Sequence, residues 1–276
     1  MQKREEIKLL AIDMDGTLVT SKKQVTPRTE RALQSAMQRG IKITIATGRY
    51  TTYLFDLLEP LGITGPAILG NGAAVMDAQK VYFHSLISEA DLRQISDLCL
   101  KERAALFVNV KGYTCCLNND YPMAAARHWA ADRPDNDIMA TLHFYDDPDA
   151  LLADVIGRTG KLIVLHFEEK RARELERIFR EQSNLGVVYS EFGHIDLANN
   201  GLTKLSGLKM VMEMYGVSPE QVMAFGDGEN DVEMISYAGF GVAMANACPD
   251  AKAAADYIAR SNDEDGVAIV IEQFLL

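Results

Sequence analysis

Several features that would place a protein in a simple class are scarce in this sequence. There is one tryptophan, and the four cysteines form no C-x-x-C pair; we interpret them as reduced thiols of a cytoplasmic protein. Lysine and arginine number 28 against 39 acidic residues, which gives a formal net charge of -11. This charge argues against nucleic acid or an anionic membrane surface as the main partner. No internal repeat or low-complexity segment stands out.

A long uninterrupted apolar run is also absent. The first six residues lead straight into the first expected strand, without the apolar region or cleavage site of a signal peptide. The most apolar terminus, residues 267–276, is interrupted by Glu272 and is too short to span a bilayer. We therefore expect a cytoplasmic protein without a membrane partner. The sequence does not specify an oligomeric state, and a monomer is compatible with it.

The chain is long enough for two domains: it has 276 residues, of which 48% are hydrophobic, and it can bury a substantial core. Its N-terminal part alternates predicted strands, at 7–12, 41–47 and 67–69, with predicted helices, at 26–40 and 48–58, and a hairpin at 75–83. Such alternation is typical of right-handed crossovers and a parallel sheet. The same pattern returns at the C-terminal end, with a helix at 202–215, a strand at 222–225 and strand-helix pieces around 240–244 and 266–274.

The middle third starts a new pattern that has no acidic strand ends. Its predicted elements are a helix capped by Ser88, a hairpin around 111–112, a helix at 123–131, a strand near 142, a helix from 149, a strand at 162–165, a helix at 168–182 and a strand at 187–189. We therefore predict an α/β fold: a Rossmann-like, doubly wound parallel-sheet core formed by residues 1–84 and 191–276, with an inserted α/β domain at residues 85–190.

The most informative segment is Asp13-Met14-Asp15-Gly16-Thr17, which follows directly on the apolar run 7–12. Ligands bind at the carboxyl ends of parallel strands, and an apolar run buried on both faces is typical of a central parallel strand. Two carboxylates at such an end require a metal or a shared proton to relieve their repulsion. A calcium loop is excluded, because Gly16 is fourth rather than sixth and a strand precedes it. A solvated turn remains open on this segment alone.

A second acidic segment, Gly226-Asp227-Gly228-Glu229-Asn230-Asp231, also follows a predicted strand. It resembles a dinucleotide fingerprint, but Asp231 replaces the third glycine and three acids would repel a pyrophosphate. The segment is suited to binding a metal, since Asp227 can join Asp13 and Asp15 around a hard cation such as Mg²⁺. An acidic first helical turn would explain Glu229 and Asp231, but not Asp227.

Three further residues suit a phosphate group. The Thr47 hydroxyl and the Gly48 backbone N–H, at the exit of the strand 41–47, can bind phosphate oxygens, and Lys204, near a helix start, can neutralise their charge. Each is unremarkable alone, because Thr-Gly is usually a turn and a helical lysine usually lies on a solvated face.

Taken together, these segments resemble the four motifs of the haloacid dehalogenase superfamily. The motifs are D-M-D-G-T at 13–17, T-G-R at 47–49, K at 204 and G-D-G-E-N-D at 226–231, in that order and each at an element boundary. The middle insertion, the pair Asn71-Gly72, and the segments G-V-A-M-A-N-A at 241–247 and S-N-D-E-D-G-V at 261–267 make the chain similar, from end to end, to the Cof-type phosphatases. One departure is Leu205, where the family commonly has glycine.

The resemblance implies a Mg²⁺-dependent phosphatase that acts on small phosphomonoesters, with sugar phosphates as the expected substrates. Asp13 would attack phosphorus to form an aspartyl-phosphate, and Asp15, protonated as substrate arrives, would protonate the leaving alcohol and then deprotonate the hydrolytic water. Mg²⁺ would bind Asp13, the backbone carbonyl of Asp15 and Asp227, with Asp231 ligating it or orienting its waters.

The remaining site residues are also implied by the resemblance. The phosphoryl group would be held by Met14, Thr47, Gly48, Lys204 and Asn230, and the substrate contacts would include Arg49, Asn71 and Gly72. The insertion would be a cap that closes over the site and selects the leaving group. Its candidate substrate-reading residues are Tyr113, His128, Trp129 and the acidic loop 132–137.

Two other functions are compatible with these motifs. A phosphomutase shares the aspartate nucleophile but returns the phosphoryl group to a sugar, and would require a bisphosphate. A regulatory phospho-acceptor domain also combines Asp, Thr and Lys at strand ends around Mg²⁺. Against that function, Asp15 lies two residues from the nucleophile, where it would hydrolyse the aspartyl-phosphate quickly, and such a domain needs no large insertion.

Overall fold

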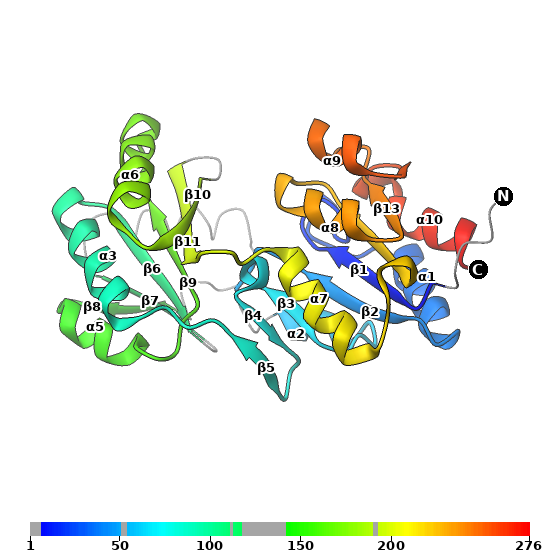
Figure 1. Ribbon diagram of the computed structural model, residues 1–276, viewed down its shortest axis with the longest axis horizontal. Helices are drawn as coiled ribbons and strands as arrows, with labels where there is room; N and C mark the ends of the chain where they lie inside the picture. Colours follow the sequence, from blue (N-terminus) through cyan, green and yellow to red (C-terminus); the bar gives the residue numbers. More distant parts are fainter. Residues whose placement is uncertain (1–6, 51–53, 111–112, 118–141, 190–192) are drawn as a thin grey trace. The chain divides into compact units, whose positions relative to one another are not determined.

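The computed structural model describes residues 7–50, 54–110, 113–117, 142–189 and 193–276. They form two compact units (Figure 1). The first unit contains the described residues up to 49, together with 54–83 and 203–276. The second contains Tyr50 and the described residues from 84 to 202.

The first unit is built on an eight-stranded sheet of order β14-β13-β12-β1-β2-β3-β4-β5. The strands are β1 (Leu9–Asp13), β2 (Lys42–Ala46), β3 (Ala67–Leu69), β4 (Ala74–Met76), β5 (Val81–His84), β12 (Val222–Gly226), β13 (Phe240–Ala243) and β14 (Tyr257–Ile258). Those from β14 to β3 run parallel, and β4 is antiparallel to β3. The predicted α/β fold with a parallel-sheet core is therefore confirmed.

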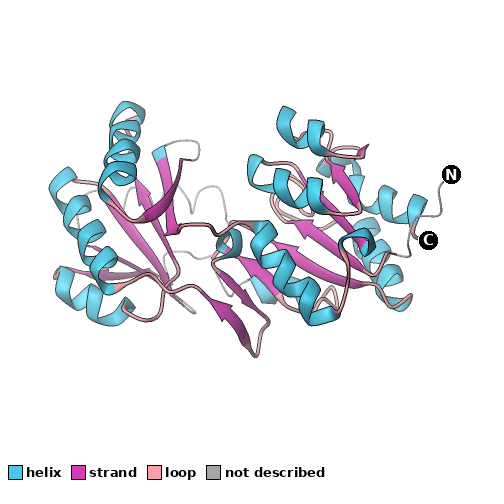
Figure 2. Ribbon diagram, in the orientation of Figure 1, coloured by secondary structure: helices cyan, strands magenta, loops and turns pink. Residues whose placement is uncertain are grey.

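Helices cover both faces of this sheet (Figures 1 and 2). They are α1 (Pro27–Gln38), α2 (Leu54–Leu58), α7 (Lys204–Tyr215), α8 (Val232–Tyr237), α9 (Pro249–Ala254) and α10 (Gly266–Phe274). Every residue of β1 is buried: Leu9 and Ala11 share a core with α7 and α8, and Leu10 and Ile12 point to the opposite face. Because β1 is buried on both faces, only its carboxyl end can present polar groups to a ligand.

The second unit is a six-stranded sheet of order β10-β11-β9-β6-β7-β8, antiparallel except for the pair β7-β8. Its strands are β6 (Ala105–Val110), β7 (Tyr113–Leu117), β8 (Leu142–Tyr145), β9 (Lys161–Leu165), β10 (Leu185–Tyr189) and β11 (His194–Asn199). The helices α3 (Glu89–Glu102), α5 (Pro148–Val155) and α6 (Glu169–Gln182) share a core with one face of the sheet. Cys115 belongs to that core, whereas Cys116 packs with Phe107 on the other face. All four cysteines are free thiols.

The second boundary of the insertion differs from the prediction. The sequence predicts that residues 194–199 belong to the core, but they form β11, which pairs antiparallel with β9 and β10 in the second unit. The units therefore divide at Leu202 and Thr203 rather than at residue 190. The sequence does indicate a strand here, since polar and apolar residues alternate in His194-Ile195-Asp196-Leu197, as they do in a half-buried strand.

Some predictions fall on residues that the structure does not describe: the helix at 123–131, His128, Trp129, the loop 132–137 and the turn at 111–112. Tyr113 is described, and its hydroxyl donates to the Asp154 carboxylate at 2.9 Å. Among the described helices, none combines the length and apolar character needed to cross a membrane.

Candidate active site

Three strand ends meet at one edge of the first sheet. Asp13 is the last residue of β1, and it pairs with Ala46, the last residue of β2, so that Thr47 follows beside it. On the other side, Ile12 pairs with Phe225 of β12, whose continuation is Gly226 and Asp227. Parallel pairing thus brings the acidic motifs at 13–17 and 226–231 to adjacent strand exits, as the sequence predicted.

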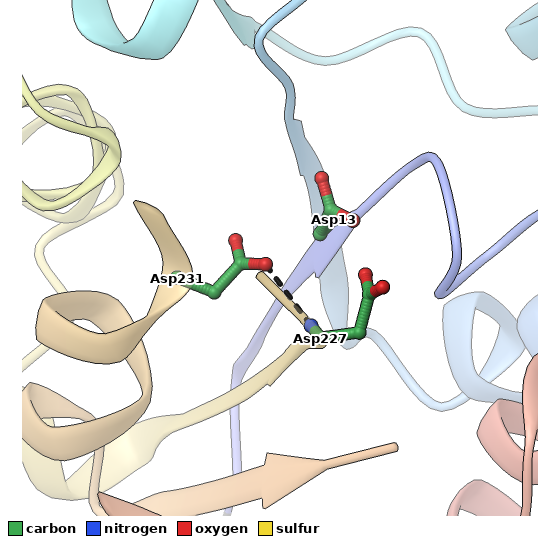
Figure 3. Close-up of side chains that lie close together, drawn as sticks. All are labelled: Asp13, Asp227 and Asp231. Atoms are coloured by element: carbon green, nitrogen blue, oxygen red, sulfur yellow. Dashed lines mark hydrogen bonds between the residues drawn. The ribbon is translucent and has the colours of Figure 1, made fainter. Parts of the chain in front are cut away.

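The carboxylates of Asp13, Asp227 and Asp231 form a cluster at this edge, with a ligand atom from each lying within 4.8 Å of the others (Figure 3). Asp13 and Asp231 are buried. Burial raises the pKa of Asp13 well above its usual range; Lys204 opposes this shift, and Asp231 and Asp227 add to it. Burial also raises the pKa of Asp227. Three carboxylates at this spacing are a hard-oxygen donor set that a divalent cation would stabilise.

Lys204 supplies the buried positive charge of the cluster. It is the first residue of α7, and the helix begins there because the Thr203 side chain accepts from the Ser206 N–H while Ser206 Oγ accepts from the Thr203 N–H. Its Nζ donates to Asp13 Oδ1 and to Asp231 Oδ1, each at 2.6 Å. Burial lowers the pKa of Lys204, but the two carboxylates outweigh burial and raise it, so the ammonium stays charged.

Asp231 organises the loop after β12. Its Oδ2 accepts from the Asp227 backbone N–H at 3.0 Å (Figure 3). The same oxygen accepts from the Gly228 backbone N–H at 2.9 Å. A Cβ on Gly226 would lie 2.3 Å from Asp231 Cβ, so this close approach requires glycine. Asp231 thus connects the loop after β12 with Lys204.

Asp227 is held by the loop that follows β1. Thr17 Oγ1 donates to Asp227 Oδ1 at 2.9 Å. Gly16 has a φ of +81°, and a Cβ there would lie 2.2 Å from Asp227 Oδ2. Glycine is therefore required at position 16 by both the backbone conformation and the proximity of the Asp227 carboxylate.

The Asp15 side chain points to a different set of partners. Arg49 binds both of its oxygens, with Nε–Oδ2 at 2.7 Å and Nη2–Oδ1 at 2.6 Å, and Lys23 Nζ lies 2.8 Å from Oδ1. Burial raises the pKa of Asp15, but Arg49 and Lys23 outweigh burial and lower it below its usual range. Asp15 is thus an ion-paired carboxylate in this structure, and its protonation as substrate arrives stays a prediction.

The other predicted phosphate and substrate residues line the neighbouring loops. Thr47 is buried; its Oγ1 accepts from the Arg49 N–H at 3.1 Å and its carbonyl accepts from the Asn71 N–H at 3.0 Å. Asn71 Oδ1 in turn accepts from Asn230 Nδ2 at 3.0 Å, which joins the loops after β3 and β12. A Cβ on Gly48 would contact Asn71 Oδ1 at 3.3 Å.

Met14 and Gly72 have evident packing functions. Met14 is buried, and its carbonyl accepts from the Val19 N–H at 3.0 Å. Gly72 has a φ of +96°, and a Cβ there would lie 2.3 Å from the Thr203 carbonyl oxygen. Gly72 therefore lets the loop after β3 approach the start of α7, beside Lys204.

Sequence reasoning missed several residues of this site. Lys23 lies in a turn and has a φ of 59°, which is unusual for a residue other than glycine, yet nothing in the local sequence pattern pointed to it. Thr17 and Asn246 lie within segments that carried the family resemblance, but neither had an assigned role. Asn246 Nδ2 donates to the Gly16 carbonyl at 2.8 Å.

Comparisons with known proteins agree with this site. Residues 10–271 match the family model of the haloacid dehalogenase-like hydrolases. The 5-amino-6-(5-phospho-D-ribitylamino)uracil phosphatase YcsE of Bacillus subtilis is 29% identical over 272 residues, which cover 98% of this chain and 97% of YcsE. A crystal structure of a haloacid dehalogenase-like hydrolase from Bacteroides thetaiotaomicron has a TM-score of 0.86 at 27% identity, covering 98% of this chain and 100% of that one.

A plant relative is longer than this chain. The protein named chloroplastic endoribonuclease YBEY of Arabidopsis thaliana is 30% identical over 274 residues. This match covers 95% of the present chain but 45% of the plant protein, so the chain spans about half the length of that relative.

Proposed function

Because the chain belongs to the haloacid dehalogenase-like hydrolases and is a phosphatase of the Cof type, we propose that it hydrolyses small phosphomonoesters, sugar phosphates among them, with Mg²⁺ and through an aspartyl-phosphate at Asp13. One observation carries the proposal: Asp13 is buried at the end of β1, paired with Lys204 and clustered with Asp227 and Asp231. The name of the B. subtilis relative supports a substrate whose phosphate is carried by a ribityl chain.

Asp13 is the nucleophile in this proposal. Its carboxylate oxygen forms a bond to phosphorus while the bond from phosphorus to the substrate alcohol breaks, and water later cleaves the aspartyl-phosphate to release inorganic phosphate. The Lys204 ammonium, 2.6 Å from Asp13 Oδ1, is placed to offset the negative charge of the attacking carboxylate and of the phosphoryl oxygens. Thr47, Gly48 and Asn230 are proposed to hold those oxygens.

The three clustered carboxylates fit a magnesium ion. Asp13 and Asp227, with the backbone carbonyl of Asp15, would hold it, and Asp231 would orient its surroundings through the bonds to Lys204 and the loop after β12. When bound, the ion supplies charge neutralisation to the transferring phosphoryl group. The single positive charge of Lys204 offsets one of the three negative charges of the ionised carboxylates, so two remain, which matches the charge of a divalent cation.

Asp15 is proposed as the acid and base, and its ion pair with Arg49 explains how it could acquire a proton. Arg49 binds Asp15 in the bidentate geometry that guanidinium groups also adopt with phosphate. A substrate phosphate competes for Arg49, and its negative charge would stand near Asp15. Both changes raise the pKa of Asp15. The acid would thus become protonated when a substrate is bound.

The second unit is proposed to act as a cap that selects the leaving group. Every residue proposed to act in catalysis (Asp13, Asp15, Thr47, Lys204, Asp227 and Asp231) belongs to the first unit. Selection and chemistry would then be encoded in separate parts of the chain.

The proposal is tested by phosphate release from a panel of phosphorylated metabolites with Mg²⁺. Wild type should release phosphate without any bisphosphate, and Asp13→Asn should lose several orders of magnitude in kcat, since an amide is a poor nucleophile. Asp250→Asn, at an exposed position of the same unit, is the control and should keep its activity. A bisphosphate requirement would indicate a phosphomutase, and a long-lived phosphorylated protein without turnover a phospho-acceptor domain. Activity of Asp13→Asn within tenfold of wild type would exclude Asp13 as the nucleophile.

A further inference from the structure

We propose that Asn246 is a positioning residue, which orients the Asp227 carboxylate and the loop after β1 for binding of Mg²⁺. The inference rests on the proposed function, because it concerns the cation of that site. Asn246 lies in the turn after β13, within the segment 241–247. This segment resembles the Cof-type family, but the resemblance assigned no role to Asn246.

The Asn246 amide joins three segments that are far apart in the sequence. Its Nδ2 donates to the Gly16 carbonyl at 2.8 Å and lies 3.4 Å from Asp227 Oδ2, and its Oδ1 accepts from the Asn262 N–H at 3.2 Å. The direction of the amide is determined by these partners. A backbone N–H can only donate and a carbonyl can only accept, so Oδ1 must face Asn262 and Nδ2 must face Gly16.

Asn262 and the residues near it form hydrogen bonds with the rest of the loop after β1, residues 14–26. Asn262 Nδ2 donates to the Val19 carbonyl at 2.9 Å, and the Ser21 N–H donates to Asp263 Oδ1 at 2.8 Å. Thr26 Oγ1 donates to Asp265 Oδ1. The segment 261–267 therefore binds the loop along its length, and Asn246 connects this segment to Asp227.

This arrangement gives each oxygen of Asp227 a donor. Thr17, in the loop after β1, donates to Oδ1, and Asn246 faces Oδ2. Asn246 thus acts on Asp227 directly, and also through the position of Gly16 and Thr17. Hydrogen bonds behind a ligating carboxylate orient it for the metal, and losing one typically costs about 10–100-fold in metal affinity.

Asn246 is exposed, so the alternative is that it only connects two surface loops and contributes to stability. The two roles differ in what a substitution changes. A positioning residue changes the affinity for Mg²⁺, and excess Mg²⁺ restores kcat. A residue that only stabilises the loops lowers the melting temperature and leaves Mg²⁺ affinity unchanged.

The test compares Asn246→Ala with wild type and with Asn200→Ala. Asn200 is the matched control: it is also an exposed asparagine whose Nδ2 donates to a backbone carbonyl, that of Asn184 at 2.6 Å, but it lies in the second unit. Mg²⁺ is titrated without substrate, by calorimetry and by its effect on the melting temperature. We expect Asn246→Ala to bind Mg²⁺ about tenfold more weakly, Asn200→Ala to match wild type, and saturating Mg²⁺ to restore the kcat of Asn246→Ala.

Mg²⁺ affinity of Asn246→Ala within twofold of wild type would overturn the inference, as would a loss of kcat that saturating Mg²⁺ does not restore. If Asn246→Ala is not folded by circular dichroism, Asn246→Ser is measured in the same way and judged by the same outcomes. A wild type that shows no binding of Mg²⁺ would instead contradict the proposed function, so the two failures are distinguishable.

Discussion

The substitution Lys204→Met tests the electrostatic design of the site. Methionine has similar length but carries no charge, so the change removes the ammonium that contacts Asp13 and Asp231, while the helix α7 and its Thr203 cap are retained. The exposed Lys209, on the same helix, is the control, and its ammonium lies over the Tyr237 ring at 4.8 Å from the centroid.

The magnitude follows from burial. Lys204 and Asp231 are each 1% exposed and Asp13 is 5% exposed, so solvent screens neither ion pair. Removing one partner of a buried ion pair leaves a charge uncompensated and costs about 3–5 kcal/mol. The control Lys209→Met loses an exposed cation–π contact that contributes about 0.5–1 kcal/mol. Lys204→Met should therefore lose a large part of a typical domain stability of about 5–15 kcal/mol.

The loss should depend on pH in a definite direction. Burial raises the pKa of Asp13 above that of an unfolded aspartate, and removing the ammonium raises it further. A carboxyl group whose pKa is higher in the folded state binds protons more tightly when folded. Its contribution to stability is therefore present at low pH and is lost as the pH rises through the raised pKa. The deficit of Lys204→Met should be smaller at acidic than at neutral pH, and added Mg²⁺ should reduce it.

The assay is urea unfolding followed by circular dichroism at pH 5 and pH 7, with and without Mg²⁺, together with calorimetry to separate the transitions of the two units. Turnover should also fall, by about 10²–10³-fold, because a preorganised charge at the transferring group is lost. A stability loss below about 1 kcal/mol that does not vary with pH would refute the reasoning, since such a loss is typical of an exposed ion pair.

Three further results are expected. Chelation with EDTA should abolish phosphate release, and Mg²⁺ should restore it. Ca²⁺ should inhibit, because it takes more ligands at longer distances and disturbs the in-line geometry. Phosphate release that persists after exhaustive chelation would remove the metal from the mechanism. Gly16→Ala should lower Mg²⁺ affinity by at least tenfold, because its Cβ would lie 2.2 Å from Asp227 Oδ2; affinity equal to wild type in a Mg²⁺ titration would contradict this. Arg49→Gln should raise KM for phosphate esters about tenfold or more, and the KM of Arg49→Lys should be intermediate, since lysine cannot bind phosphate in a bidentate geometry. An unchanged KM in steady-state kinetics would argue against a contact between Arg49 and phosphate.

Local rules acting on the sequence determined most of the elements and the identity of the motif residues. Thr26 caps α1 and Ser88 caps α3 as predicted, because a side-chain oxygen at that position satisfies a backbone N–H of the first turn. The apolar run before Asp13 indicated a strand buried on both faces, which placed its acids at a ligand-binding edge. These predictions needed only neighbours along the chain.

Other features depend on pairing that no local pattern specifies. The strand β11 alternates as expected for a half-buried strand, but which sheet it joins is decided by its hydrogen bonds to β9 and β10. The insertion boundary was therefore wrong in the sequence analysis, although the alternation itself was visible.

Only the tertiary structure decided the states and partners of the charged groups. The family resemblance implied that Asp15 acts as an acid once substrate arrives. The ion pairs with Arg49 and Lys23 that lower its pKa depend on how the loops after β1 and β2 approach one another. Asn246 had no assigned role until the fold placed its amide against Gly16 and Asp227. The physical reason is common to both cases: secondary structure responds to residues a few positions apart, whereas desolvation, Coulomb interactions and hydrogen bonds between loops depend on distances that exist only after the strands have paired.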